Sequence, residues 1–426
     1  MMSPGKTIIP LFFLLAILFV PYPVMGLEPL SQPRWDVPLV HTGYLENPAP
    51  VIHVTCEGHL ISVNYPYKPD FFVYDGNGTL LFNKTLSAEK PPWITSISPT
   101  PDGTGLAVTQ LVPGCCHGSV SNTTSNKVIF LDRSGRMVWE YATREPPLAS
   151  AVVPNTHDNI IGTVDGRIIC LDRNGSIRWT TRVEAPVLSL TVSADGKTIV
   201  ASGDSNYDAW KQYGEPLRPF DLFFLDAEGN VLGKYQTRGQ NMVTVSRNAS
   251  AIAVIGGPFG NLMLFNRSGT KTDERSFIKT ASGLSMNDEG TRIVLETSDG
   301  QVFCLDEKLR VKGNIPAEPG SRGFAVSGTG DSFARGNNRT VTLYRTTGEI
   351  LDTYPADSLI RVIAPVPGSD SFVIATEEKI VFLNGTAPEP DRDLLPDRAA
   401  VDPTQSQKPV SIVIPFFNFS ILVGGK

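Results

Sequence analysis

The sequence has little of several features that would narrow its class. Only five cysteines occur in 426 residues, which excludes a small scaffold stapled by disulfides. Lysine and arginine number 37 against 43 aspartates and glutamates, so the net charge of −6 provides no basic stripe for nucleic acid. Long runs with the 3.6-residue period of an amphipathic helix are also missing. Valine, isoleucine, threonine, phenylalanine and turn residues are abundant instead, and this favours an all-β protein.

Motifs for catalysis are scarce as well. All five histidines precede residue 158, and none of them has the HxH or HExxH spacing of a metal site. Neither a GxSxG nucleophile motif nor a glycine loop for nucleotides occurs. The sequence therefore predicts no catalytic residues.

The N-terminal segment has the features of an export signal. Lys6 precedes an apolar run of about 13 residues, Ile8 to Val20, which is shorter than the roughly 20 residues that span a bilayer. Val24 and Gly26 are small residues at the two positions that usually precede a cleavage point. We expect residues 1–26 to be a signal peptide or, alternatively, an N-terminal anchor. Either way, the rest of the chain would be extracytoplasmic, either secreted or on the cell surface.

Asn-x-Ser/Thr sequons support the same location. The sequence has nine of them, against about three or four expected by chance. An alternative explanation is turn chemistry, because Asn-Gly turns followed by Ser or Thr create sequons without any sugar being attached. The nine sequons begin at Asn77, Asn83, Asn122, Asn174, Asn248, Asn266, Asn338, Asn384 and Asn418.

One short phrase recurs along the chain, as in VYDGNGTLLF, FLDRSGRMVW and CLDRNGSIRW. Its third residue is usually aspartate, and successive copies lie 39 or 40 residues apart except for two intervals of 57 and 54. The underlying period is therefore about 40 residues, with two insertions. The aspartate position is occupied by Asp75, Asp132, Asp172, Asp226, Asn266, Asp306, Arg345 and Asn384.

Each repeat predicts four strands. The phrase itself reads as a hairpin, and a second hairpin precedes it, as in the segment around Asp195 and Gly196. A single unit of 40 residues buries too little surface to be stable, whereas units packed radially share a core, as in a β-propeller. We expect one all-β propeller over residues 35–386, with eight blades of four antiparallel strands, or alternatively seven blades and a stray hairpin. The last repeat lacks its outer strand, which Trp35 to Leu39 would supply to close the ring.

The phrases around Trp139 and Trp179 resemble the repeats of the pyrroloquinoline-quinone-like (PQQ-like) propeller superfamily. In that family a tryptophan late in the hairpin docks one blade on the next, which implies this role for Trp35, Trp139 and Trp179. Together with the export signal and the sequons, the repeats look like those of surface propellers from methanogenic archaea. The resemblance is specific for the fold and weak for activity, because propellers have many unrelated functions.

The two faces of such a ring should differ. We call the face with the first-to-second and third-to-fourth turns of each blade the turn face, and the opposite face the loop face. Both insertions are second-to-third loops, so they belong to the loop face, two blades apart. The sequons at Asn77, Asn174, Asn248, Asn266 and Asn384 all fall in turns of the turn face. We therefore expect glycans on the turn face and partner binding on the loop face. The alternative is that the insertions have no function.

The first insertion contains Cys115, Cys116 and His117. Adjacent cysteines can form a vicinal disulfide in an oxidising compartment. Some quinone-dependent dehydrogenases of the superfamily that this chain resembles place the ring closed by a vicinal disulfide against the cofactor. The alternatives are a weak metal site that includes His117, and free thiols.

The second insertion offers oxygen ligands with the spacing of a calcium loop. Asp204, Asn206, Asp208 and Glu215 fall at positions 1, 3, 5 and 12 of such a loop, but Ala209 replaces the usual glycine. Calcium is therefore one reading, and a solvated polar loop is the other. Three aromatic residues of this insertion are candidate partner contacts, namely Tyr207, Trp210 and Tyr213.

The C-terminal residues divide into two parts. Residues 387–409 are rich in proline and charge and predict a disordered linker. Residues 410–426 are mostly apolar, but the run is too short for a membrane span. This segment could be a peripheral membrane contact, a strand added to another subunit, or a segment docked on the propeller.

These observations predict a non-catalytic propeller on the cell surface that binds a protein or a surface glycan through its loop face. No cofactor is expected, with calcium as an open option. The first alternative is a quinone-dependent dehydrogenase, whose PQQ site cannot be assembled from the sequence. The second is a scaffold in envelope assembly.

Overall fold

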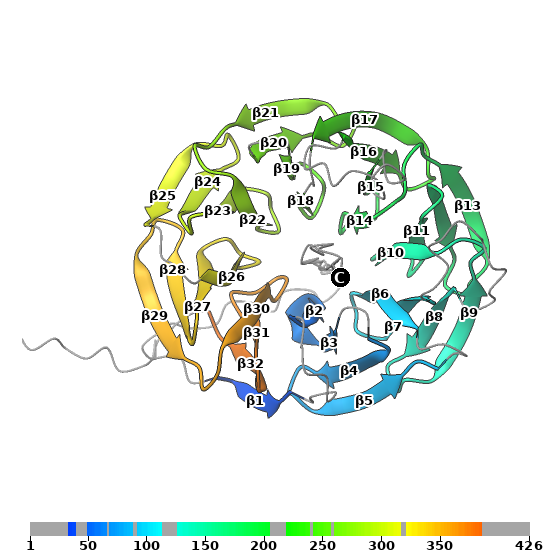
Figure 1. The fold of residues 1–426 in the computed structure, drawn as a ribbon, viewed down its shortest axis with the longest axis horizontal. Helices are drawn as coiled ribbons and strands as arrows, with labels where there is room; N and C mark the ends of the chain where they lie inside the picture. Colours follow the sequence, from blue (N-terminus) through cyan, green and yellow to red (C-terminus); the bar gives the residue numbers. More distant parts are fainter. Residues whose placement is uncertain are drawn as a thin grey trace, which may run out of the picture.

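The computed structural model describes residues 33–39, 49–65, 68–87, 92–112, 126–204, 219–238, 242–256, 260–316 and 321–385. Its strands form eight four-stranded antiparallel sheets, arranged radially around one axis (Figure 1). Each sheet is one blade, and the prediction of eight blades is confirmed against the alternative of seven. Within the residues just given, no helix is long and apolar enough to cross a membrane.

The first four blades follow one another in the sequence, and their strands run from the inner edge outward. Blade 1 comprises β2 (Val51–Val54), β3 (Leu60–Asn64), β4 (Asp70–Asp75) and β5 (Leu80–Thr85), with a 3-10 turn, η1 (Cys56–Gly58), after β2. Blade 2 comprises β6 (Trp93–Pro99), β7 (Gly105–Leu111), β8 (Lys127–Asp132) and β9 (Met137–Ala142). Blade 3 comprises β10 (Pro147–Val152), β11 (Asn159–Thr163), β12 (Arg167–Leu171) and β13 (Ile177–Arg182). Blade 4 comprises β14 (Ser189–Val192), β15 (Thr198–Asp204), β16 (Pro219–Asp226) and β17 (Val231–Arg238).

The remaining blades repeat this order. Blade 5 comprises β18 (Met242–Val245), β19 (Ile252–Gly256), β20 (Asn261–Phe265) and β21 (Lys271–Arg275). Blade 6 comprises β22 (Ala281–Met286), β23 (Arg292–Thr297), β24 (Val302–Asp306) and β25 (Val311–Ile315). Blade 7 comprises β26 (Ser321–Val326), β27 (Ser332–Asn337), β28 (Thr340–Arg345) and β29 (Ile350–Pro355). Blade 8 comprises β30 (Ile360–Pro365), β31 (Phe372–Thr376), β32 (Lys379–Leu383) and β1 (Trp35–Pro38).

Blade 8 closes the ring by pairing the two ends of the propeller. Strand β1 pairs antiparallel with β32, and Trp35 lies opposite Phe382 in this register. The amide of Arg34 donates to the Phe382 carbonyl over 2.8 Å, which continues the ladder by one residue. The N-terminal strand thus covers the edge that β32 would otherwise expose. The prediction of closure through this strand is confirmed.

The recurring aspartate builds the turn between the third and fourth strands. Asp172 Oδ1 accepts hydrogen bonds from the amides of Asn174 and Ser176, both over 2.8 Å. One carboxylate therefore satisfies two backbone donors within a tight turn. The same pair of bonds, from the residues two and four positions later, recurs at Asp75, Asp132, Asp226, Asn266 and Asp306.

The hydrophobic core is divided among the blade junctions. In the junction between blades 1 and 2, for example, Leu60 and Val73 pack in one buried cluster with Ile97 and Leu106. Because strand side chains alternate between two sides, each blade contributes to one cluster with the preceding blade and another with the following blade. Adjacent blades are therefore the units whose contacts hold the fold together.

Candidate functional site

The turn face carries a closed ring of contacts between neighbouring blades. At the junction of blades 5 and 6, the Arg247 amide donates to the Asp288 carbonyl over 2.6 Å. At the junction of blades 8 and 1, the Glu57 amide donates to the Pro367 carbonyl over 3.1 Å. The other six junctions have the pairs Asp288 N to Gly328 O, Gly328 N to Ser369 O, Asp195 N to Arg247 O, Asn155 Nδ2 to Asp195 O, His157 Nε2 to Asp102 Oδ2, and Arg133 Nη2 to His59 O. The turns on this face thus connect each blade to the next around the whole propeller.

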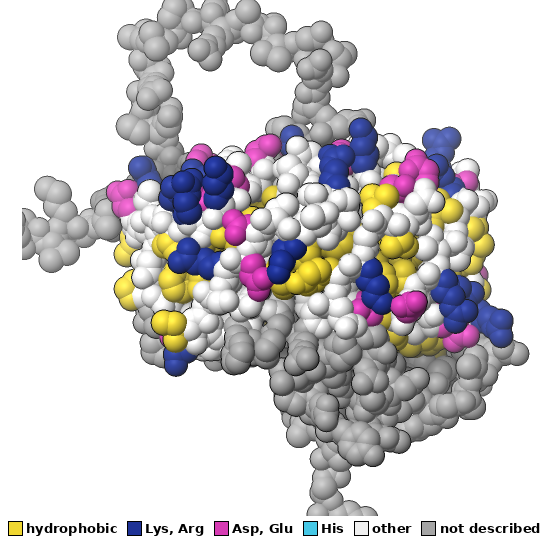
Figure 2. Space-filling model, turned by 90° about the horizontal axis from the view of Figure 1, so that it is seen from above, with side chains coloured by type: hydrophobic (Ala, Val, Ile, Leu, Met, Phe, Trp, Pro, Cys, Tyr) yellow, Lys and Arg dark blue, Asp and Glu magenta, His cyan; other side chains and the backbone are white. Residues whose placement is uncertain are grey.

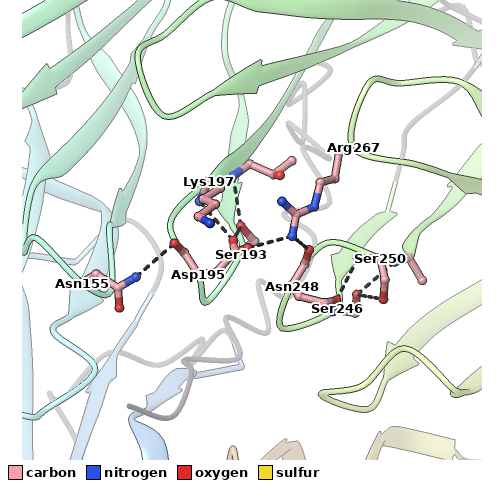
Figure 3. A network of polar contacts seen from close by, with 10 residues as sticks. Asn155, Ser193, Asp195, Lys197, Ser246, Asn248, Ser250 and Arg267 are labelled. Carbon is pink, nitrogen blue, oxygen red and sulfur yellow. Dashed lines mark hydrogen bonds and ion pairs between the residues drawn. The ribbon is translucent and has the colours of Figure 1, made fainter. Parts of the chain in front are cut away.

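Arg267 joins a network of polar contacts between the turns of blades 4 and 5 on this face (Figure 3). Its Nη2 lies 2.7 Å from Asp195 Oδ2 in blade 4, and it also donates to the Asn248 carbonyl in blade 5. Burial opposes ionisation of Asp195, but hydrogen bonds from Ser193 and the Lys197 amide and the charge of Arg267 lower its pKa overall. The guanidinium therefore ties two inner turns together across a junction.

Sequence reasoning did not identify this arginine, although a signal was present. Arg267 directly follows the aspartate position of its repeat, and Arg133 holds the same place in blade 2. Arg133 also reaches inward, from Nη1 to the Gly103 carbonyl over 3.3 Å and from Nη2 to the His59 carbonyl over 3.4 Å. An arginine at this repeat position is thus a candidate clamp between blades.

Aromatic side chains dock four consecutive junctions at the outer edge of the ring. Trp139 Nε1 in blade 2 donates to the Arg173 carbonyl in blade 3 over 2.9 Å. Its ring lies against Gly175, whose φ of 84° favours glycine and where a Cβ would lie 2.9 Å from the ring. Trp35 and Trp179 make the same pair of contacts, with Gly76 and Gly78 and with Ala227 and Gly229, and Phe82 packs on Gly135 without a polar bond.

The five sequons of the turn face differ in how their asparagines are used. Asn77 and Asn174 are exposed and occupy the same place in two repeats, two residues after the aspartate. Asn384 is exposed and directly follows β32. By contrast, Asn248 Oδ1 accepts from the Ser250 amide, and Asn266 Oδ1 accepts from the Ser268 and Thr270 amides. Asn248 and Asn266 therefore have a role in their own turns, and glycosylation of the five asparagines stays a prediction.

The loop face receives both insertions, each between the second and third strands of its blade. The first lies between β7 and β8 and the second between β15 and β16, with one blade between them. Asp204 is the last residue of β15. The other residues predicted from the insertions lie outside the described residues, namely Cys115, Cys116, His117, Asn206, Tyr207, Asp208, Trp210, Tyr213 and Glu215. Their roles in a disulfide, a calcium site or partner contacts stay predictions.

A buried carboxylate lies close to the second insertion. Asp221 in β16 has a side chain with 1% exposure, and its Oδ2 lies 3.4 Å from Lys234 Nζ. Gln236 Nε2 donates to its other oxygen over 3.0 Å, and Lys234 also pairs with the exposed Glu184 of blade 3 at 2.9 Å. The hydrogen bond that Lys234 donates to Glu184, together with the charges of Asp221 and Glu184, raises the pKa of Lys234. A charged cluster therefore ties β16 to β17 and to Glu184, close in sequence to the second insertion.

A second buried charge joins blades 6 and 7. Arg335 in β27 is 1% exposed, and its Nη2 donates to the Gly300 carbonyl over 2.5 Å. Its Nε lies 3.9 Å from Glu296 Oε1 of β23. A buried guanidinium requires such compensation, because an unpaired charge in the interior is costly.

A buried histidine lies in the junction between blades 1 and 2. His53 in β2 pairs in register with Ser62 in β3, and both side chains are buried. Burial lowers the pKa of His53 to about 4, so the imidazole is neutral at pH 7. The buried thiols of Cys170 and Cys304 are neutral too, because burial raises the pKa of each to about 12. In the described part of the chain, no three His, Cys, Asp or Glu side chains form a group that could hold a metal ion.

Comparisons with known proteins point to the same architecture. A family model described as outer membrane protein assembly factor BamB matches residues 124–308, and another described as beta-propeller protein matches residues 4–205. No curated protein matches the sequence.

Solved propeller structures resemble the whole ring. BamB from Moraxella catarrhalis is 14% identical with a TM-score of 0.53, over 83% of this chain and 97% of its own. The Dos1 propeller is 9% identical with a TM-score of 0.61, over 83% and 96%. The C-terminal WD40 domain of Sif2 is 10% identical with a TM-score of 0.57, over 80% and 97%. At these identities the likeness concerns the fold: the chain is an eight-bladed β-propeller, and residues 124–308 of it are similar to the BamB family model.

Proposed function

We propose that this propeller is a non-catalytic extracytoplasmic scaffold that binds a protein partner through its loop face. The difference between the two faces carries the proposal. On the turn face, turns of adjacent blades contact one another at every junction. The loop face has the two longest connections between strands, and long loops on a rigid ring are common binding elements.

The loop face also has an unusually exposed apolar residue. Ile278, in the link between blades 5 and 6, has a relative exposure of 101%, so its side chain has almost no contact with the rest of the chain. An exposed side chain of this kind provides a probe position on this face.

Photo-crosslinking in the native envelope tests the proposal. A photoreactive residue at position 278 is expected to form an adduct with one protein, identified by mass spectrometry, and shortening both insertions should abolish it. The matched control is position 134, an exposed serine in a blade 2 turn on the opposite face. Adducts at position 134 with none at position 278 would overturn the proposal. So would reduction of a dye after purified protein is reconstituted with quinone and calcium, since that is dehydrogenase activity.

A further inference from the structure

Arg335 departs from the pattern of its repeat position. It lies in β27 opposite Thr342 of β28, and Thr342 is three residues before the aspartate position of blade 7. A buried charge is costly, so a single blade that has one here needs a reason for it. In the other seven blades this position of the second strand has a buried apolar residue, namely Val63, Val108, Ile161, Ala201, Val254, Leu295 and Ile374.

The guanidinium group of Arg335 holds two segments of the loop face. Its Nη2 donates to the Gly300 carbonyl over 2.5 Å, and its Nη1 donates to the Pro316 carbonyl over 3.4 Å. Gly300 lies in the turn between β23 and β24, and Pro316 directly follows β25. Both segments belong to the loop face of blade 6. The several donors of a planar guanidinium allow one side chain to hold both carbonyls.

The turn that contains Gly300 also holds the link that presents Ile278. The Ser298 amide donates to the Thr280 carbonyl over 2.8 Å, and Thr280 is two residues after Ile278. Arg335 of blade 7 is therefore connected through the blade 6 turn to the link between blades 5 and 6. Segments of three consecutive blades thus meet around one buried arginine.

We propose that Arg335 is the positioning residue for partner binding at the Ile278 surface, which comprises the link 276–280 and the turn 297–301. This inference rests on the proposed loop-face function. Arg335 is 1% exposed, so it does not contact the partner itself and acts through the Gly300 carbonyl. A turn that is already held in one arrangement loses less conformational freedom when a partner binds, which favours binding.

Hydrogen exchange tests whether Arg335 holds the turn. Arg335→Met combined with Glu296→Met replaces the charged pair by apolar side chains of similar length, a change that often preserves stability. We expect at least tenfold faster exchange at the Ser298 amide, because the turn loses its bond from Arg335. Unchanged exchange at Ser298 would overturn the proposal.

Two controls separate this effect from a general loosening of the propeller. The Glu377 amide of blade 8 bonds to the Leu359 carbonyl of the link before that blade over 2.9 Å, and its exchange should not change in the double variant. Ile374→Met changes the repeat position of Arg335 in blade 8 and should leave exchange at Ser298 unchanged. Equal acceleration at Ser298 and Glu377, or acceleration at Ser298 by Ile374→Met, would contradict the proposal.

Photo-crosslinking tests whether the arrangement of the turn matters for binding. With p-benzoylphenylalanine at position 278 in the native envelope, we expect the adduct yield of the double variant to fall at least fivefold while its Tm stays unchanged. A full yield together with faster exchange at Ser298 would show that Arg335 has only a structural role and would overturn the proposal. Absence of an adduct in the protein that keeps Arg335 would instead overturn the proposed function, and this inference with it.

Arg335→Lys provides a second variant, which decides the question if the double variant does not fold. A lysine keeps the charge, but its compact ammonium group lacks the fork of donors that reaches two carbonyls. We expect faster exchange at Ser298 than in the original protein and an adduct yield between those of the original protein and the double variant. Faster exchange with the full adduct yield would overturn the proposal.

Discussion

Two junctions of the same ring are held together in different ways. Between blades 2 and 3, the Trp139 ring covers Gly175 and its Nε1 bonds to the Arg173 carbonyl. Between blades 5 and 6, Asp273 and Leu309 take the places of the tryptophan and the glycine, and a cleft remains. The local turn is the same in both cases, with one aspartate accepting two amides. Only the fastening between blades has changed.

The comparison teaches that docking and turn formation are separate functions of the repeat. Asp306 has no tryptophan from the previous blade above its turn. Burial opposes its ionisation, but the amides of Arg310 and Lys308 and their neighbouring cations hold the pKa of Asp306 far below its usual value. A repeat can therefore lose its docking pair and keep its turn. The residues at the two docking positions of that junction can then differ from tryptophan and glycine without loss of the turn.

Removing a docking tryptophan should have the largest effect. Trp139→Ala deletes a ring that is 9% exposed, so we expect the free energy of unfolding to fall by about 3–5 kcal/mol. Asp273→Ala changes the same repeat position in blade 5 and should cost less than about 0.5 kcal/mol. Urea unfolding followed by fluorescence measures both values. Similar losses for the two variants would show that the junctions do not differ in this way.

Acid should weaken the junction between blades 1 and 2 from its inner end. The pKa of His53 is about 4 in the folded protein and 6.5 in an unfolded chain, so the unfolded state binds the proton first. The stability from neutral His53 is complete above pH 6.5 and is lost as the pH falls towards 4, by about 3 kcal/mol in total. Unfolding by urea between pH 7 and pH 4 measures the slope. A His53→Asn variant that keeps the full slope would exclude this histidine as the cause.

Adding a methyl group to the glycine beneath the tryptophan ring should lower the free energy of unfolding less than removing the ring does. Gly175→Ala places a Cβ at a φ of 84° and 2.9 Å from Trp139, and we expect a loss of about 2 kcal/mol. Gly348 holds the same turn position in blade 7, and its nearest neighbour is 3.4 Å away on Ile315. Gly348→Ala should therefore lower the free energy of unfolding only through strain of its backbone conformation, by about 1 kcal/mol. Thermal unfolding compares the Tm values of the two variants. A larger loss for Gly348→Ala than for Gly175→Ala would refute the claim that the Trp139 ring packs tightly on Gly175.

The smallest change is the loss of the indole hydrogen bond alone. Trp139→Phe keeps an aromatic ring on Gly175 but removes the donor to the Arg173 carbonyl, at a cost of about 1 kcal/mol. Phe82 packs on Gly135 in the same way, which shows that the propeller accepts phenylalanine at this repeat position. A loss as large as that of Trp139→Ala would mean that the hydrogen bond, and not the packing, fastens the blades.

Much of the architecture could be predicted from the sequence because it follows from local repetition. The spacing of Asp132, Asp172 and their equivalents indicates blades of about 40 residues, and the similarity of Trp35 to Trp179 indicates the closing strand. Surface clefts were harder to predict from the sequence, because they depend on the distance between adjacent blades. The cleft beside Leu309 is an example, since its walls come from two repeats and no single motif encodes it.

Hydrogen exchange of two equivalent turns is the most direct test of the central claim that aromatic docking fastens the blades. The amides of Ser176 and Arg310 bond to the aspartates of their own turns over 2.8 and 2.9 Å, so the local structure is matched. Of these two turns, the one in blade 3 lies under a tryptophan ring and the one in blade 6 does not. At neutral pH we predict at least tenfold slower exchange at Ser176 than at Arg310, after correction for intrinsic rates. Equal protection at the two amides, or slower exchange at Arg310, would contradict the account.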